Sequence, residues 1–162
     1  MGEEGEIVSE PIKSQFELDV YKMAFDSAMR IFNITKTYPI GERYSLTDQI
    51  RRSSRSVYAK ISEVWRKRRY LDAFVCKLNE SESEASETQT LIQFYLKCGY
   101  ISKEESNDLF QLFDQIIGKL LNMINNPKPR ILPIKNDFLR FSSAPFLLCS
   151  HAHRPLCSLS IS

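Results

Sequence analysis

Basic side chains are concentrated in one stretch of this sequence of 162 residues. Nine of the residues from 43 to 69 are lysine or arginine, whereas only Asp48 and Glu63 are acidic. Arginine suits phosphate groups because its planar guanidinium offers paired donors, and such contacts are independent of base sequence but sensitive to salt. The stretch therefore predicts a surface for RNA or DNA. Its candidate residues are Arg51, Arg52, Arg55, Lys60, Arg66, Lys67, Arg68 and Arg69.

Aromatic residues lie among these basic residues, and aromatic rings can stack on unpaired bases. They are Tyr58, Trp65 and Tyr70. A second interpretation considers residues 70–98, which contain five acidic residues and only two lysines. The basic stretch would then be a solvated surface or would pair with the acidic one, within a chain or between subunits of a structural oligomer, with Trp65 and some tyrosines in the core. The sequence leaves both interpretations open.

Residues suited to metal or nucleophilic chemistry form no convincing group. Glu80, Glu84 and Glu87 share one helical face, but a di-iron bundle also needs Glu-x-x-His pairs from other helices, and no histidine precedes position 151. Without a histidine to act as base, Cys76 and Cys98 are predicted to be small buried thiols. The remaining candidates near the C-terminus do not match the usual zinc spacings; they are Cys149, His151, His153 and Cys157. We therefore expect no metal, no cofactor and no enzymatic activity.

Four segments carry apolar residues at alternating spacings of three and four, which is the pattern of an amphipathic α-helix. They cover about residues 16–38, 45–69, 70–97 and 102–126. Similar lengths and short connections favour antiparallel neighbours. The sequence therefore predicts an all-α fold, an antiparallel up-down-up-down four-helix bundle over residues 16–126. The basic stretch would form its second helix and the acidic stretch its third.

Local signals indicate where these helices begin, end and pack. Ser102 and Glu105 have the spacing of a capping box, Gly99 suits the left-handed residue that ends a helix, and Ser45 or Thr47 could be an N-cap. The second helix is predicted to have small residues in the middle of its buried face, which would let a neighbour approach closely. The predicted buried seam of the third helix follows the a/d pattern and consists of Phe74, Leu78, Ser81, Ala85, Thr88, Ile92 and Tyr95.

The two ends of the sequence differ in composition from the bundle. Residues 1–15 are polar and acidic, which predicts a flexible arm without the features of a secretory signal. Residues 127–162 contain five prolines and are predicted to be a disordered tail outside the fold. There is no apolar run of about 18 residues and no CxxC pair. We therefore expect a cytoplasmic protein with free thiols and no membrane partner.

Three short motifs resemble the bacterial 23S rRNA intervening-sequence proteins. They are LTDQIRRSS at 46–54, ISE at 61–63 and CGYIS at 98–102, and the likeness extends over about residues 16–126. The resemblance implies four-helix bundles that assemble into ring-like homopentamers. The related accessory variability proteins of diversity-generating retroelements also form basic pentamers, and these bind nucleic acid. The resemblance thus favours a homo-oligomer, a pentamer, with RNA or DNA as a partner.

This sequence departs from the family pattern near the middle of the second helix. Many members have A-N-I-A-E-G where residues 59–64 here read AKISEV. Lys60 therefore replaces an asparagine, and Val64 replaces a glycine. Because valine lacks the backbone freedom of glycine, the second helix is predicted to continue unbroken into the basic residues at 66–69.

Overall fold

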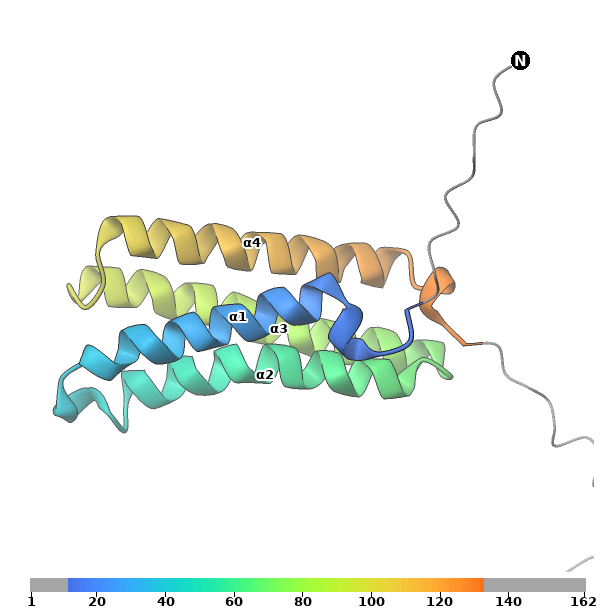
Figure 1. Ribbon diagram of the computed structural model, residues 1–162, viewed down its shortest axis with the longest axis horizontal. Helices are drawn as coiled ribbons and strands as arrows, with labels where there is room; N and C mark the ends of the chain where they lie inside the picture. Colours follow the sequence, from blue (N-terminus) through green and yellow to red (C-terminus); the bar gives the residue numbers. More distant parts are fainter. Residues whose placement is uncertain (1–11, 133–162) are drawn as a thin grey trace, which may run out of the picture.

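The computed structural model describes residues 12–132, and in that part of the chain it contains helices and no strand (Figure 1). The four α-helices are α1 (Asp19–Ile34), α2 (Leu46–Lys67), α3 (Leu71–Lys97) and α4 (Lys103–Asn125). Short 3-10 turns flank them: η1 (Gln15–Glu17), η2 (Thr35–Thr37), η3 (Ile40–Glu42) and η4 (Lys128–Arg130). The helices run alternately in opposite directions, and α1 packs on α2 and α4 while α3 packs on α2 and α4. The predicted antiparallel four-helix bundle is confirmed.

The buried seam of α3 forms the centre of the core, and all seven of its predicted residues are buried. Small side chains let α2 and α3 approach closely there, as predicted. The Ser81 hydroxyl donates to the backbone carbonyl of Val57 at 3.0 Å, and the Thr88 hydroxyl donates to Ser53 Oγ at 3.0 Å. These bonds satisfy hydroxyls that would otherwise be costly to bury between two helices.

Two of the predicted helix ends are confirmed by their hydrogen bonds. Glu105 N donates to Ser102 Oγ at 3.1 Å and Ser102 N donates to Glu105 Oε2 at 3.2 Å, which completes the capping box of α4. Gly99 has a φ of 72° at the end of α3. The amides of Gly99 and Tyr100 donate back to Leu96 and Tyr95, in the pattern of a Schellman motif.

Two helix starts differ from the sequence expectation. The first helix begins at Asp19 rather than near Phe16, because residues 15–17 form the separate turn η1 and Phe16 is exposed. Ser45 occupies the N-cap position of α2, but its hydroxyl bonds back to Glu42 instead of capping the helix. Thr47 lies inside α2 with a buried hydroxyl that has no hydrogen-bond partner among the described residues.

Removal of the capping box is expected to destabilise the bundle modestly. Ser102→Ala leaves the Glu105 amide without its acceptor, and the loss of such a cap costs about 1 kcal/mol. The matched control is Ser83→Ala, because Ser83 is exposed in the middle of α3. Urea denaturation should show a lower midpoint for Ser102→Ala only. Equal midpoints for the two variants would contradict this role of the cap.

The chain after α4 crosses the end of the bundle. Ile131 packs against the core, and Leu132 N donates to the backbone carbonyl of Arg68 at 2.9 Å. This contact ties the segment to the turn that joins α2 to α3. Residues 133–162, including the cysteines and histidines considered for zinc, and residues 1–11 of the predicted arm lie outside the described residues.

Candidate nucleic-acid interface

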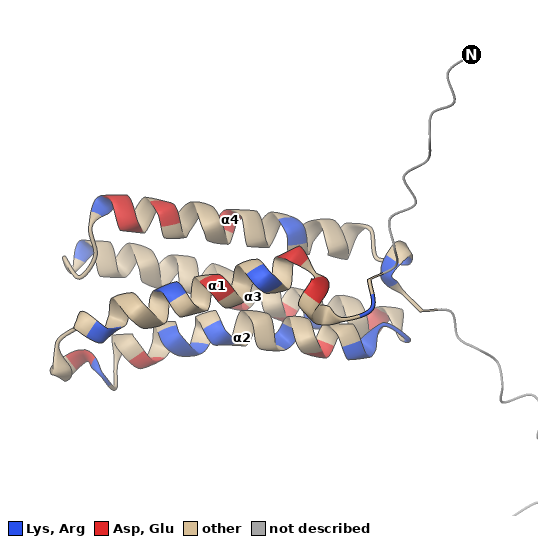
Figure 2. Cartoon of the chain, viewed as in Figure 1, with Lys and Arg blue, Asp and Glu red and all other residues tan. Residues whose placement is uncertain are grey.

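The basic residues of α2 divide into a group that is open to solvent and a group held by other side chains. At 3.6 residues per turn, positions 52, 55 and 66 fall on one stripe of the helix. Arg52, Arg55 and Arg66 are exposed there, and Figure 2 shows basic residues at several places along α2, with fewer acidic ones between them. Lys67 and Arg69 are exposed at the C-terminal end of this helix and in the turn after it.

These five side chains, Arg52, Arg55, Arg66, Lys67 and Arg69, are called the open basic set below. Within residues 12–132, no carboxylate lies within ion-pair distance of any of them. Arg55 Nε donates to the carbonyl of Arg51 at 2.8 Å, which fixes the stem of that side chain against its own helix. The open basic set therefore consists of exposed cations, none of which is in an ion pair within the described chain.

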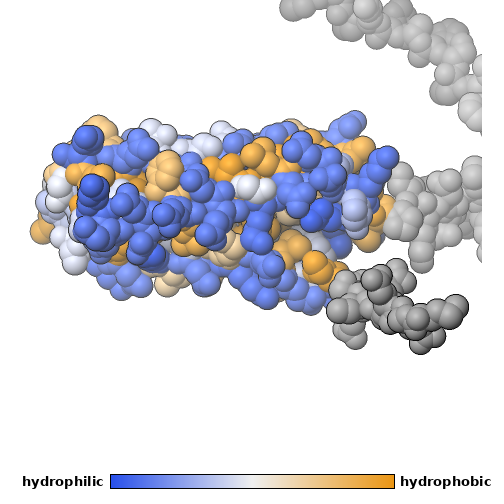
Figure 3. Space-filling model, turned by 90° about the horizontal axis from the view of Figure 1, so that it is seen from above, coloured by the Kyte–Doolittle hydropathy of each residue, from blue (hydrophilic) through white to orange (hydrophobic). Residues whose placement is uncertain are grey.

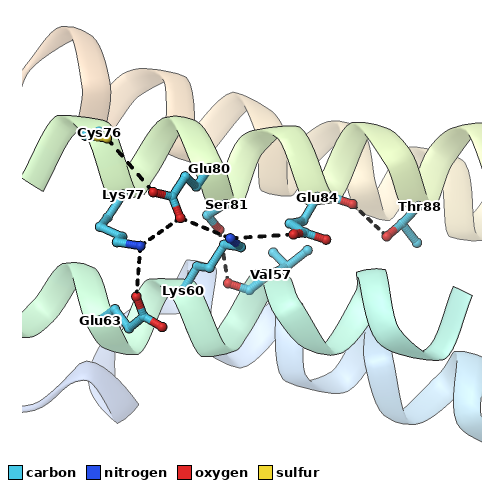
Figure 4. A network of polar contacts seen from close by, with 9 residues as sticks. All are labelled: Val57, Lys60, Glu63, Cys76, Lys77, Glu80, Ser81, Glu84 and Thr88. Carbon is cyan, nitrogen blue, oxygen red and sulfur yellow. Dashed lines mark hydrogen bonds and ion pairs between the residues drawn. The ribbon is translucent and has the colours of Figure 1, made fainter. Parts of the chain in front are cut away.

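Lys60 points instead toward α3, where it meets two carboxylates (Figure 4). Its Nζ lies 3.0 Å from Glu80 Oε2 and 3.5 Å from Glu84 Oε1. The hydrogen bond to Glu80 raises the pKa of Lys60, against the opposing effect of burial. Lys77 completes the network, at 2.8 Å from Glu80 and 3.2 Å from Glu63. The predicted pairing of basic α2 with acidic α3 thus exists within one chain, and it involves Lys60.

Arg51 and Arg68 are held against aromatic rings. Arg51 Nε donates to Thr35 Oγ1 at 2.7 Å, and its guanidinium carbon lies 4.9 Å from the Phe32 ring centroid. The Arg68 guanidinium carbon lies 3.2 Å from the Trp65 centroid, and Arg68 Nε donates to the Trp65 carbonyl. Burial, with a smaller effect from Arg66, lowers the pKa of Arg68. Arg51 therefore joins α2 to the end of α1, whereas Arg68 folds back onto Trp65 of its own helix.

Of the three aromatic residues that could stack on bases, one has an open ring. Trp65 is covered by Arg68, and Tyr58 packs edge-on against Tyr21 and Phe25 with centroid distances of 6.0 and 5.4 Å. Tyr70 is 66% exposed in the turn that follows the basic residues. An unpaired base near that turn would find Tyr70 available for stacking.

Two of the three glutamates considered for a metal site, Glu80 and Glu84, are paired with lysine. Glu80 and Glu84 contact Lys60, and the described residues contain no group of three or more histidine, cysteine, aspartate or glutamate side chains placed to hold a metal. Cys76 and Cys98 are exposed, so the prediction that they are buried thiols is wrong. Their positions on the outer surface of α3 and at its end explain the exposure.

The network predicts a measurable pH effect on stability. Hydrogen bonds from Lys77 and then Lys60 lower the pKa of Glu80 below its ordinary 4.5. A lowered pKa means that Glu80 stabilises the fold above about pH 4.5 and loses this effect as the pH falls through the folded-state pKa. The melting temperature should therefore fall less steeply between about pH 5 and about pH 3 in Glu80→Gln than in the wild type.

The control for this pH effect is Glu87→Gln. Glu87 is exposed on the same helix and has no ion pair among the described residues. Its variant should keep the wild-type slope. A wild-type slope in Glu80→Gln as well would show that the network does not contribute to the acid sensitivity.

These features define a class: an all-α antiparallel bundle whose long second helix carries exposed arginines. Residues 16–122 match the family model of the 23S rRNA-intervening sequence proteins, and the chain belongs to this family. The resemblance seen in the sequence motifs is thus confirmed. No match among curated proteins was found.

A solved structure supports the same fold. It is a protein of unknown function of the S23 ribosomal protein family from Bacteroides thetaiotaomicron, with 26% sequence identity and a TM-score of 0.61. The match covers 66% of this chain and 96% of that one.

As predicted from Val64, α2 runs unbroken to Lys67, and Val64 is buried. None of the helices in the described part of the chain is long and apolar enough to span a membrane.

Proposed function

We propose that this chain is a non-enzymatic, cytoplasmic homo-oligomer, a pentamer, that binds the phosphate backbone of RNA or DNA through the open basic set. The observation that carries this proposal is the group of five exposed cations on α2 and in the turn after it, none of which has a carboxylate partner among the described residues. A strongly charged row of this kind attracts polyanions, and each phosphate contact gains free energy from released counter-ions.

The dimensions of α2 suit a nucleic-acid backbone. A helix of 22 residues is about 33 Å long at 1.5 Å per residue. The basic residues from 52 to 69 therefore extend over about 25 Å, enough to meet several successive phosphates. The open ring of Tyr70 at one end of this row would add stacking wherever bases are unpaired.

Exposed hydrophobic side chains support the oligomer. Phe25, Met29 and Phe32 lie at spacings of four and three on α1, and each is at least 40% exposed. Leu121 is exposed on α4, and Figure 3 shows hydrophobic patches within an otherwise hydrophilic surface. Apolar surface of this kind is stabilised when another subunit covers it. Repeated copies of the basic row would then bind one nucleic acid together, so weak contacts would gain from multivalency.

The test is a salt-titrated binding measurement with mixed-sequence RNA and DNA oligonucleotides, coupled to light scattering of the full chain. We expect a pentamer whose affinity falls steeply as salt rises. A pentamer that binds neither nucleic acid at low salt would favour the alternative, a structural scaffold that binds a protein partner. A monomer would contradict the proposed assembly.

A further inference from the structure

A small cavity lies between the end of α1 and the start of α2, and basic side chains dominate its charge. Its volume is about 280 Å³, and Lys36, Arg43 and Arg51 contribute to its wall. None of the residues that line it is acidic. This end of the bundle lies opposite the one where the chain crosses after α4 (Figure 1).

Two of these cations are held close together by one aromatic ring. Lys36 Nζ lies 4.7 Å from the Phe32 centroid, and the Arg51 guanidinium carbon lies 4.9 Å from it. Both distances end at the same point, so the two charges are at most about 10 Å apart, within about one Debye length in 0.1 M salt. The two charges therefore repel each other, and an anion between or beside them would offset this repulsion by attracting both.

The protein does not supply that anion within residues 12–132. Neither Lys36 nor Arg51 has a carboxylate within ion-pair distance there. Glu42 belongs to the neighbouring turn η3, but its carboxylate accepts hydrogen bonds from Ser45 and from Tyr100. The cavity thus gathers positive charge that no described side chain neutralises.

Arg51, which lines the cavity, has hydrogen-bonding capacity that its contacts within the described residues do not use. Arg51 uses its Nε–H on Thr35, which leaves the terminal amino groups of the guanidinium available. Thr47, in the first turn of α2, lines the cavity, and its buried hydroxyl has no partner among the described residues. The start of α2 also presents the positive end of the helix dipole.

We propose that this cavity binds a phosphate group, held by Lys36, Arg43 and Arg51. Its volume is close to the lower limit of about 300 Å³ for small-molecule sites, so the ligand is a phosphate ion, a small phosphate ester or the terminal phosphate of a nucleic acid. The guanidinium of Arg51 suits the oxygens of a phosphate because its donors lie in one plane. The site is separate from the open basic set and does not depend on the function proposed for it.

Isothermal titration of the full chain with inorganic phosphate tests this site, with sodium chloride of equal ionic strength as the reference. We expect saturable binding of one phosphate per chain that weakens about tenfold or more in Lys36→Met and in Arg51→Met, since hydrogen bonds to charged groups are individually strong. Lys22→Met is the matched control, because Lys22 is exposed on α1, does not line the cavity and does not belong to the open basic set. Lys36→Met keeps the test valid if Arg51→Met unfolds, since Lys36 is exposed.

The source of the phosphate is identified with two oligonucleotides that differ only in a 5′-phosphate or a 5′-hydroxyl. A preference for the 5′-phosphate that disappears in Lys36→Met would assign the site to a nucleic-acid end. Equal affinities, together with saturable binding of inorganic phosphate, would assign it to a free phosphate or small ester. Absence of saturable binding beyond chloride, or equal binding by the Lys36, Arg51 and Lys22 variants, would overturn the proposal.

Discussion

Replacement of Arg52, Arg55, Arg66 and Arg69 together by glutamine is expected to weaken nucleic-acid binding by about a hundredfold at about 50 mM salt. Each lost phosphate contact removes about 0.7 to 0.9 from the slope of log affinity against log salt, so the slope should become shallower by about 3. The fold should persist, because these side chains are exposed and make no ion pair among the described residues. Fluorescence anisotropy with a labelled oligonucleotide measures both quantities.

A charge-matched variant separates position from net charge. Glutamine at Lys22, Lys97, Lys103 and Lys119 removes the same number of positive charges from exposed positions outside α2. Its affinity should fall much less, since these lysines do not lie along one row. Equal losses in the two variants would show that general electrostatic attraction, rather than the α2 row, causes binding. Dissociation of the oligomer in the arginine variant alone would instead identify the row as a subunit contact.

Phe113→Ala is expected to have the largest effect on stability. Phe113 is fully buried in the core between α4 and its neighbours. Truncation of a buried phenylalanine removes its packing contacts and leaves a cavity, which costs about 3–5 kcal/mol. Since a domain is stable by only about 5–15 kcal/mol, the variant should lose a large share of its stability. Urea denaturation followed by circular dichroism measures this loss.

Leu121→Ala is the matched control on the same helix. Leu121 is 43% exposed, so its truncation should cost less than about 1 kcal/mol. The comparison is made at a protein concentration low enough to dissociate an oligomer, because Leu121 could lie between subunits. Similar losses for the two variants would contradict the assignment of Phe113 to the core.

The bundle was predictable because its determinants are local and periodic. The seam of α3 repeats at spacings of four and three, and the residues that end helices, such as Gly99 and Ser102, act on their immediate neighbours. The start of α2 was less predictable, because the Ser45 hydroxyl has a competing acceptor in Glu42, and a sequence pattern does not rank two nearby partners. The exposure of Cys76 follows from the predicted seam itself, because position 76 is two residues from both Phe74 and Leu78 and therefore lies on the opposite side of α3.

The candidate site was predictable in composition but not in detail. The arginines of α2 can be recognised in the sequence, because their residue type and their spacing along the helix are enough to identify them. Contacts with other helices divide the basic residues of α2 into an exposed group and a group held by other side chains. Lys60 contacts Glu80 on α3, and Arg51 contacts Phe32 and Thr35 at the end of α1. These partners are separated from α2 residues by up to 20 positions in the chain, and only the packing of the bundle brings them together.

Crosslinking of bound RNA to the full wild-type chain, followed by mass spectrometry of the modified peptides, tests the central claim most directly. RNA that contains photoreactive 4-thiouridine should label residues of α2 and the turn after it, from Arg52 to Tyr70. Labelling should decrease as salt rises, because the contacts are with phosphate. Labelling concentrated on α3 or α4, or no labelling under conditions of low salt, would contradict the assignment of nucleic-acid binding to the open basic set.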